Sequence, residues 1–248
     1  MKPVAIIQHM AGDEPGHIAV CLRERGIDYQ VIRVDRGEPL PTTAGDLAGL
    51  VSIGGAMGAN DPLPWIADEL RLMRAADAAR VPIAGHCLGA QLMARAFGAT
   101  VTKNPVREHG WAELTIDNPA LAREWLGDCA DTPITALQWH ADTFSLPPGA
   151  QRILSGRYCA NQAFVLRDRH LAVQSHFEIE PAQLRGWAEK RATLIAETVA
   201  RDGVGPTQPV IAILAEVEQR TAAGHRVLER LYERWLRGIS SHRRRSSV

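Results

Sequence analysis

The amino-acid sequence predicts an α/β fold in which helices cover both faces of a parallel sheet. Short apolar runs alternate with helical patterns through the first hundred residues, the order expected for parallel strands joined by helices. One of these runs ends in the pentapeptide from Gly85 to Gly89, which has glycines two residues on either side of Cys87. This is the spacing of a nucleophile elbow, a sharp turn between a strand and a helix. The chain of 248 residues, 46% of them hydrophobic, is long enough to bury the core of one large domain.

Each element of the parallel part has its own signal. Runs rich in β-branched residues predict strands at 4–7, 29–34, 50–53 and 81–86. Apolar residues at intervals of three and four predict helices at 17–25, 65–80 and 88–97. In such sheets ligands gather at the carboxyl ends of the strands. Both Gly54-Gly55 and Cys87 fall at such ends.

The second half of the chain indicates an antiparallel or mixed portion. Segment 111–116 alternates with period two, and 134–140 and 163–166 are further strand candidates. A last strand, 170–175, ends just before His176, and Pro181 begins a long helix to about residue 201.

A break rich in proline and glycine at 203–209 precedes a final helix, which we expect at 210–236 with an interruption near Gly224. The polar, basic tail, 240–248, is expected to be a disordered end rather than a nucleic-acid-binding arm, because one short run supplies few phosphate contacts. We therefore predict one domain at 1–205 and a C-terminal helical extension with a disordered tail at 206–248.

Composition excludes several classes of protein. The 28 Lys and Arg balance the 28 Asp and Glu, so no global field attracts nucleic acid or an anionic membrane, and small neutral or zwitterionic ligands are favoured. Four widely spaced cysteines argue against a zinc site or a disulfide framework. No signal peptide and no apolar stretch of roughly 20 residues is present. We expect a cytoplasmic protein.

Three residues have the chemistry of a nucleophile and its base. A thiol at a helix N-terminus, as expected for Cys87, is activated by the helix dipole and by unpaired N–H groups. A cysteine nucleophile needs a base with an orienting group. His176 and Glu178 are two residues apart at a strand end, so both side chains lie on one face and can point toward the elbow.

Three motifs occur in one order along the chain: Gly54-Gly55, the stretch from Gly85 to Gln91, and the stretch from Val173 to Glu178. A fourth, Glu108 to Trp111, follows the elbow helix. Over about residues 3–200 they resemble the class I glutamine amidotransferase domain, in its free-standing, GMP-synthase-like subgroup. The resemblance implies a three-layer, flavodoxin-like, mostly parallel sheet with a nucleophile elbow.

The resemblance also implies roles for particular residues. Cys87, His176 and Glu178 would form a triad that hydrolyses a γ-glutamyl amide through a thioester, as a glutaminase or γ-glutamyl hydrolase does. Backbone N–H groups of Gly55 and Leu88 would hold the oxyanion. Residues expected at the end of the substrate that carries the α-amino and carboxylate groups are Gly54, Gln91, His140 and Asp142.

The sequence departs from the family pattern at three positions. Phe177 stands where the family has a proline between the histidine and the glutamate, Ala56 stands after the two glycines in place of a proline, and Ala141 stands in place of a glycine. None of these changes removes a side chain that does chemistry. They bear instead on the backbone of the oxyanion turn and on contacts to the substrate end.

Two other interpretations stay open at this point. A cysteine elbow also occurs in α/β-hydrolases of the dienelactone hydrolase type, for which Asp142 with His170 or His176 would complete the triad. A non-catalytic regulatory protein on the same fold is the other. We expect no cofactor and no metal, and we expect scattered histidines such as His9 and His86 to be ordinary polar residues.

The expected partner is glutamine or a γ-glutamyl small molecule. Either a separate synthetase subunit accepts the ammonia or water is the only acceptor in the reaction, since we expect no acceptor domain in this chain. The final helix has enough apolar positions to pack on the domain or on a second copy of it, so a homodimer is a further expectation.

Overall fold

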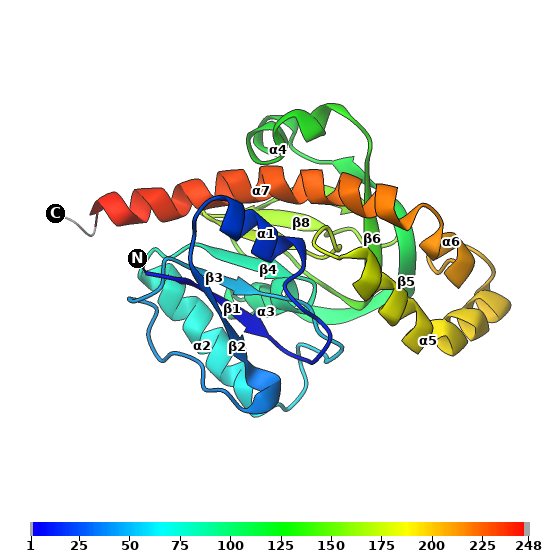
Figure 1. Cartoon of the computed structure of the whole chain (residues 1–248), viewed down its shortest axis with the longest axis horizontal. Helices are drawn as coiled ribbons and strands as arrows, with labels where there is room; N and C mark the ends of the chain where they lie inside the picture. Colours follow the sequence, from blue (N-terminus) through cyan, green and yellow to red (C-terminus); the bar gives the residue numbers. More distant parts are fainter. Residues whose placement is uncertain (1, 246–248) are drawn as a thin grey trace.

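The computed structural model describes the backbone of residues 2–245 and the side chains of residues 2–239 (Figure 1). Its centre is a nine-stranded sheet in the order β2-β1-β3-β4-β9-β8-β7-β5-β6. The strands are β1 (Val4–Gln8), β2 (Tyr29–Arg33), β3 (Gly49–Ser52), β4 (Ile83–His86), β5 (Val101–Ile116), β6 (Ile134–Phe144), β7 (Ala150–Gly156), β8 (Ala163–Leu166) and β9 (His170–Val173).

The predicted α/β class is confirmed, and the sheet is mixed. Strands β2, β1, β3, β4 and β9 pair in parallel, whereas β9, β8, β7, β5 and β6 pair antiparallel. The parallel arrangement thus covers one half of the sheet. Antiparallel pairing begins at β8, because β8 and β9 are joined by a short turn at 167–169, which cannot make the crossover that parallel strands require.

The helices are α1 (His17–Glu24), α2 (Pro64–Ala78), α3 (Leu88–Ala96), α4 (Pro119–Leu126), α5 (Pro181–Asp202), α6 (Val210–Leu214) and α7 (Val217–Arg245), with two short 3-10 helices, η1 (Val34–Arg36) and η2 (Gly127–Asp131). In the part of the chain that the structure describes, none of them is both long and apolar enough to cross a membrane.

Two apolar clusters on opposite faces of the sheet make the fold three-layered. Along β1, Val4 and Ile6 belong to the cluster that contains α1, α4 and α7. Ala5 and Ile7 belong to the cluster that contains α2 and α3. Successive side chains of a strand point to opposite faces, so a strand buried on both faces reads as a continuous apolar run.

Helix α7 differs from the sequence prediction at both of its ends. The break falls at Glu216, which has a positive φ of 52°, and the helix continues through Gly224 to Arg245. The predicted interruption near Gly224 is therefore wrong: a Cβ there would lie 3.6 Å from Cα of Phe177, so this glycine permits a close approach of two backbones. The backbone of 240–245 is helical rather than disordered, and 246–248 lie outside the described residues.

Helix α7 packs across the fold (Figure 1). Its buried residues, among them Leu228, Leu231 and Trp235, lie in one cluster with Ile18 and Leu22 of α1. The sequence allowed this helix to pack either on its own domain or on a second copy of it. In the structure it packs on its own domain. The side of α7 that faces the sheet is therefore part of the core.

Candidate active site

Cys87 lies in a strained turn between β4 and α3. Its backbone has φ 48° and ψ −106°, a conformation rare for residues other than glycine and concentrated at functional sites. The turn needs both flanking glycines: a Cβ on Gly85 would lie 2.6 Å from the Gly89 carbonyl oxygen, and a Cβ on Gly89 would lie 2.1 Å from that of Ser52. The N–H of Cys87 donates to the carbonyl of Val173 at 2.8 Å. The predicted elbow is thus present.

His176 and Glu178 follow the end of β9. The strand ends at Val173, earlier than the sequence suggested, and the N–H of His176 donates to the carbonyl of Leu137 at 2.8 Å. The Nδ1 atom of His176 lies 2.7 Å from Oε1 of Glu178. Both side chains are almost fully buried. The pairing predicted from their spacing is present.

Charge controls the protonation of this pair. Burial by itself would lower the pKa of His176, but the Glu178 carboxylate and then the Cys87 side chain outweigh it, so the pKa lies well above the usual 6.5. Burial would raise the pKa of Glu178, and the adjacent His176 outweighs it, so that pKa is lowered. The geometry therefore favours an imidazolium form of His176 that lies between the Glu178 carboxylate and the sulfur of Cys87.

The second carboxylate oxygen of Glu178 faces a residue that the sequence interpretation treated as ordinary. Nδ1 of His86 lies 3.6 Å from it, and Nε2 of His86 lies 2.9 Å from the hydroxyl of Tyr232 on α7. Burial raises the pKa of Tyr232 well above its usual 10, so the hydroxyl stays protonated. His86 directly precedes Cys87, and its position at the end of a buried strand was the only sequence signal for this contact.

The turn at Gly54 and Gly55 lies against the elbow. A Cβ on Gly54 would lie 3.4 Å from Cε1 of His176, and one on Gly55 would lie 2.9 Å from Cδ2 of Leu88. Leu88 is the first residue of α3, where the N–H has no partner within the helix. No backbone acceptor among the described residues pairs with the N–H of Gly55 or Leu88.

His9 contacts the backbone of this turn. Its Nδ1 lies 3.0 Å from the carbonyl oxygen of Gly54, and its Nε2 lies 3.0 Å from Oε2 of Glu69. The Ser52 hydroxyl donates to the other oxygen of Glu69 at 2.5 Å. Burial alone would lower the pKa of His9, but Glu69 raises it above 6.5, so both ring nitrogens can donate. The sequence interpretation missed this role, although His9 follows the end of a parallel strand.

A pocket of about 390 Å³ opens beside Cys87 and His176. It lies beyond the carboxyl ends of the parallel strands, as expected. Gln91, His140 and Asp142, which were expected at the substrate end, all line it, and Gly54 lies behind it next to His176. Pocket residues that the sequence interpretation did not identify are Met10, Asp13, Met57, Gly58, Lys103, Arg107, His109, Trp139, Trp187, Lys190 and Arg191.

The polar side chains of the expected substrate end contact one another or the neighbouring backbone. The side-chain amide of Gln91 donates to Oε1 of Gln174 at 3.1 Å. His140 is held between the backbone oxygen of Asp142, at 3.0 Å, and Oε2 of Glu108, at 3.2 Å. The Asp142 carboxylate accepts from Nζ of Lys103 at 2.6 Å. These contacts fix the pocket wall before a ligand binds.

The hydrolase alternative needs His170 or His176 beside Asp142. His170 begins β9 and therefore lies at the opposite end of that strand from the elbow. It contacts Asp77 at 2.9 Å and accepts from the N–H of Ile83 at 3.1 Å. Burial, with Arg169 and Arg167, lowers its pKa to about 3. His176 pairs with Glu178, so neither histidine forms the required pair with Asp142.

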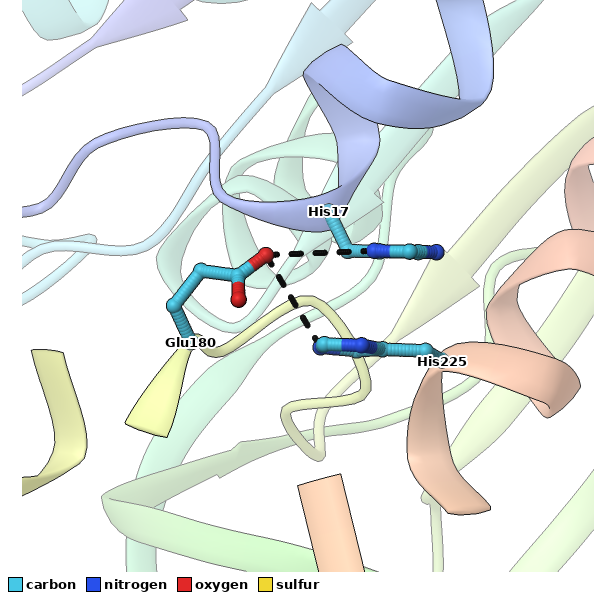
Figure 2. Close-up of side chains that lie close together, drawn as sticks. All are labelled: His17, Glu180 and His225. Atoms are coloured by element: carbon cyan, nitrogen blue, oxygen red, sulfur yellow. Dashed lines mark ion pairs between the residues drawn. The ribbon is translucent and has the colours of Figure 1, made fainter. Parts of the chain in front are cut away.

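One group of side chains away from the pocket has the composition of a metal site. Figure 2 shows the Glu180 carboxylate at the edge of the stacked rings of His17 and His225, 3.8 Å and 4.0 Å from their nearest nitrogens. The rings are stacked, with centroids 3.9 Å apart and planes 5° apart. Lone pairs of parallel rings do not converge on one ion. His17 pairs with Glu229 and His225 donates to the carbonyl of Ile179, so the group joins α1, α5 and α7.

The family model for glutamine amidotransferase class I matches residues 16–186. This range is more than two thirds of the chain, and it includes Cys87, His176 and Glu178. The chain belongs to the class I glutamine amidotransferase family.

One solved structure agrees with this assignment, and a second shares the fold. A glutamine amidotransferase from Methylobacillus flagellatus is 41% identical, with a TM-score of 0.88 over 96% of this chain and 95% of that one. A glutamine amidotransferase from Thermotoga maritima is 23% identical, with a TM-score of 0.78 over 96% of this chain and 97% of that one. The second likeness shows the shared fold.

Curated relatives match over shorter stretches. The glutamine amidotransferase-like protein YfeJ of Salmonella typhimurium is 30% identical over 123 residues, 48% of this chain and 52% of that protein. GMP synthase of Natranaerobius thermophilus is 51% identical over 41 residues, 16% of this chain and 8% of the synthase. This chain thus matches about half the length of the first relative and a small part of the second.

Proposed function

We propose that this amidotransferase hydrolyses the γ-amide of glutamine or of a γ-glutamyl compound through a thioester on Cys87. The observation that supports it most is the strained elbow, which holds Cys87 in one pocket with His176, itself paired with Glu178 at 2.7 Å. Nucleophile, base and orienting group are the set that covalent catalysis requires.

Each group has a defined step. The Cys87 thiolate attacks the γ-carbonyl carbon, and the oxyanion that forms accepts hydrogen bonds from the N–H groups of Gly55 and Leu88. His176 gives its proton to the leaving nitrogen, the C–N bond breaks and a thioester remains. Water, deprotonated by His176, then attacks the thioester, which releases glutamate and the thiol. Glu178 holds the imidazole in position and stabilises its charge throughout.

The substrate end would occupy the wall formed by Gln91, His140 and Asp142, with Gly54 adjacent. Gln91 lies one turn beyond the nucleophile on α3, and its side chain lines the pocket. A carboxylate and an amide, such as those of Asp142 and Gln91, suit an α-amino group and an α-carboxylate respectively. The proposed orientation of the substrate in the pocket depends on these two assignments.

Water is the proposed acceptor of the γ-glutamyl group, and the ammonia or amine leaves the site unchanged, so the protein would act alone. Similarity to a glutamine-hydrolysing GMP synthase supports the alternative, in which a synthetase partner receives the ammonia. Steady-state kinetics separate the two. A rate barely above background that rises only when a co-purifying synthetase is added would contradict independent action.

The decisive experiment measures glutamate release from glutamine and from γ-glutamyl peptides by the purified chain. A kcat in the usual enzyme range of roughly 1–1,000 per second is expected. Cys87→Ala should fold and lose activity by several orders of magnitude. Cys129→Ala, which alters a half-buried thiol outside the pocket, is the matched control. Undiminished turnover by Cys87→Ala would disprove the proposal and leave a non-catalytic or different hydrolytic role.

A further inference from the structure

One wall of the catalytic pocket is strongly basic. Lys103 and Arg107 of β5, together with Lys190 and Arg191 of α5, line it, and the acidic residues that line it are Asp13 and Asp142. The chain as a whole has no net charge. The excess of positive charge is therefore local to the site, and such local fields concentrate anionic ligands.

The two carboxylates of the pocket already have partners. Asp142 accepts from Lys103 at 2.6 Å. Asp13 accepts from the indole N–H of Trp187 at 2.9 Å. Within residues 2–239, no carboxylate forms an ion pair with Arg107 or Arg191, so two guanidinium groups that line the pocket have no counter-charge.

A buried histidine lies next to these arginines. His109 lines the pocket, is 3% exposed, and its Nδ1 has no hydrogen-bond partner. Burial first, and then the charges of Arg107 and Arg191, lower its pKa to about 4. The imidazole is therefore neutral at pH 7, so Nδ1 is free to contact a ligand and does not compete with the arginines for an anion.

Aromatic rings connect this wall to the triad. The ring of His109 packs edge-on against Trp139 at 4.7 Å, Trp139 lies 5.8 Å from Trp187, and Trp187 packs edge-on against His176 at 5.0 Å. A ligand attached to Cys87 would thus have a continuous surface leading from the base to the arginines. Flat apolar walls with a few charged groups are typical of small-molecule sites.

We propose that Arg107 and Arg191 form an anion subsite for the leaving group, so that the preferred substrate is a γ-glutamyl conjugate of an amino acid with a free carboxylate. This inference rests on the proposed γ-glutamyl hydrolysis. Guanidinium groups bind carboxylates with strong, charge-assisted hydrogen bonds. Ammonia, the leaving group of glutamine, has no carboxylate to place there, and a pocket of about 390 Å³ lies in the range of sites that hold molecules larger than one amino acid.

The reaction itself is unchanged and balances in atoms. The bond between the γ-carbonyl carbon and the amino nitrogen of the second amino acid breaks as the thioester forms, and His176 supplies the proton that this nitrogen gains. Water then releases glutamate. The products are glutamate and a free amino acid, which dissociates from the arginines.

The test compares γ-glutamylglycine with γ-glutamylglycinamide, which differ only in the charge of the distal group, and with glutamine. The wild-type kcat/KM should favour the carboxylate by roughly 10- to 100-fold, the range for a hydrogen bond to a charged group. In the double variant Arg107→Met, Arg191→Met this ratio should fall to about one, mainly through KM. A variant that keeps Arg107→Met but carries Arg191→Lys in place of Arg191→Met should recover part of the preference for the carboxylate.

Arg201→Met is the matched control, because Arg201 lies on the same helix as Arg191, is exposed, and pairs with Asp202 outside the pocket. It should leave the ratio unchanged. Equal kcat/KM for the two dipeptide analogues, or a ratio that survives the double variant, would overturn the subsite while leaving the proposed function in place. Absence of hydrolysis of all three compounds would overturn the proposed function and the subsite with it.

Discussion

The hydroxyl of Tyr232 lies 2.9 Å from Nε2 of His86, the residue that precedes the elbow cysteine. The other ring nitrogen of His86 lies 3.6 Å from Oε2 of Glu178. Helix α7 therefore reaches the carboxylate of the proposed triad through one imidazole. A helix near the C-terminus, far in sequence from the elbow, supports the back of the site.

Tyr232→Phe tests this support. The variant leaves Nε2 of His86 buried without its partner, and we expect a loss of about 1–3 kcal/mol in the free energy of unfolding. We also expect a lower kcat with little change in KM, because Tyr232 lies behind the pocket and does not line it. Urea denaturation and steady-state kinetics measure the two effects. Tyr29→Phe, which removes an exposed hydroxyl bonded to Arg23, should change neither, and equal behaviour of both variants would rule out the connection.

A γ-glutamyl-directed alkylating analogue should modify Cys87 in preference to the other thiols. Burial raises the pKa of Cys21 to about 12 and raises those of Cys129 and Cys159, so these thiols are largely protonated. Cys87 differs from them in place, because it lies in the turn before α3 and lines the pocket with His176. Mass spectrometry of the labelled peptides locates the adduct. Label on any of the other three cysteines instead of Cys87 would refute the assignment of the nucleophile.

Glu178→Gln should change how stability depends on pH. The pKa of His176 is raised above 6.5, so its contribution is complete below about pH 6.5 and is lost as pH rises through the higher folded value. The pKa of Glu178 is lowered from 4.5, so its contribution is present above about pH 4.5 and is lost on further acidification. The destabilisation caused by Glu178→Gln should be largest between these values and shrink at alkaline pH. A pH-independent difference in urea unfolding would contradict the ion pair.

Gly89→Ala should be strongly destabilising. The new Cβ would lie 2.1 Å from the carbonyl oxygen of Ser52, a backbone atom at the end of β3, so α3 or β3 must shift, at a cost of about 1–3 kcal/mol or more. Gly186→Ala in α5 is the control, since a Cβ at this position would have nothing within 4 Å of it; it should stabilise by about 0.5–1 kcal/mol through helix propensity. If thermal unfolding showed that both variants change the stability in the same direction, the tight packing of the elbow would be contradicted.

Local patterns were sufficient to predict the parallel half of the fold and the three residues of the proposed triad. The apolar strands, the amphipathic α2 and the glycines around Cys87 act through neighbours in sequence, and so does the pairing of His176 with Glu178. A residue pattern can report such contacts because their geometry follows from backbone periodicity. The ranges of β1, β4 and α3 accordingly differ from prediction by at most two residues at each end.

Long-range packing decided the rest. The first half of β5 carries polar side chains and Pro105 without alternation. It pairs with β6 at 101–103 and again from Glu108, across an irregularity, and the paired residues of β6 lie more than 25 positions later. Gly224 indicated a break because glycine is a poor helix former, but its contact with Phe177 keeps it inside α7.

The pocket also combines positions that local patterns predict with contacts that only long-range packing creates. Sequence alone placed Cys87, His176 and the glycine turn at the ends of parallel strands, since those positions follow from strand direction. Only the tertiary structure brought Arg107 of β5 and Arg191 of α5 to one cavity and Tyr232 of α7 to His86. These contacts join segments that are far apart in the sequence, and they exist because distant apolar faces pack together, which no local periodicity encodes.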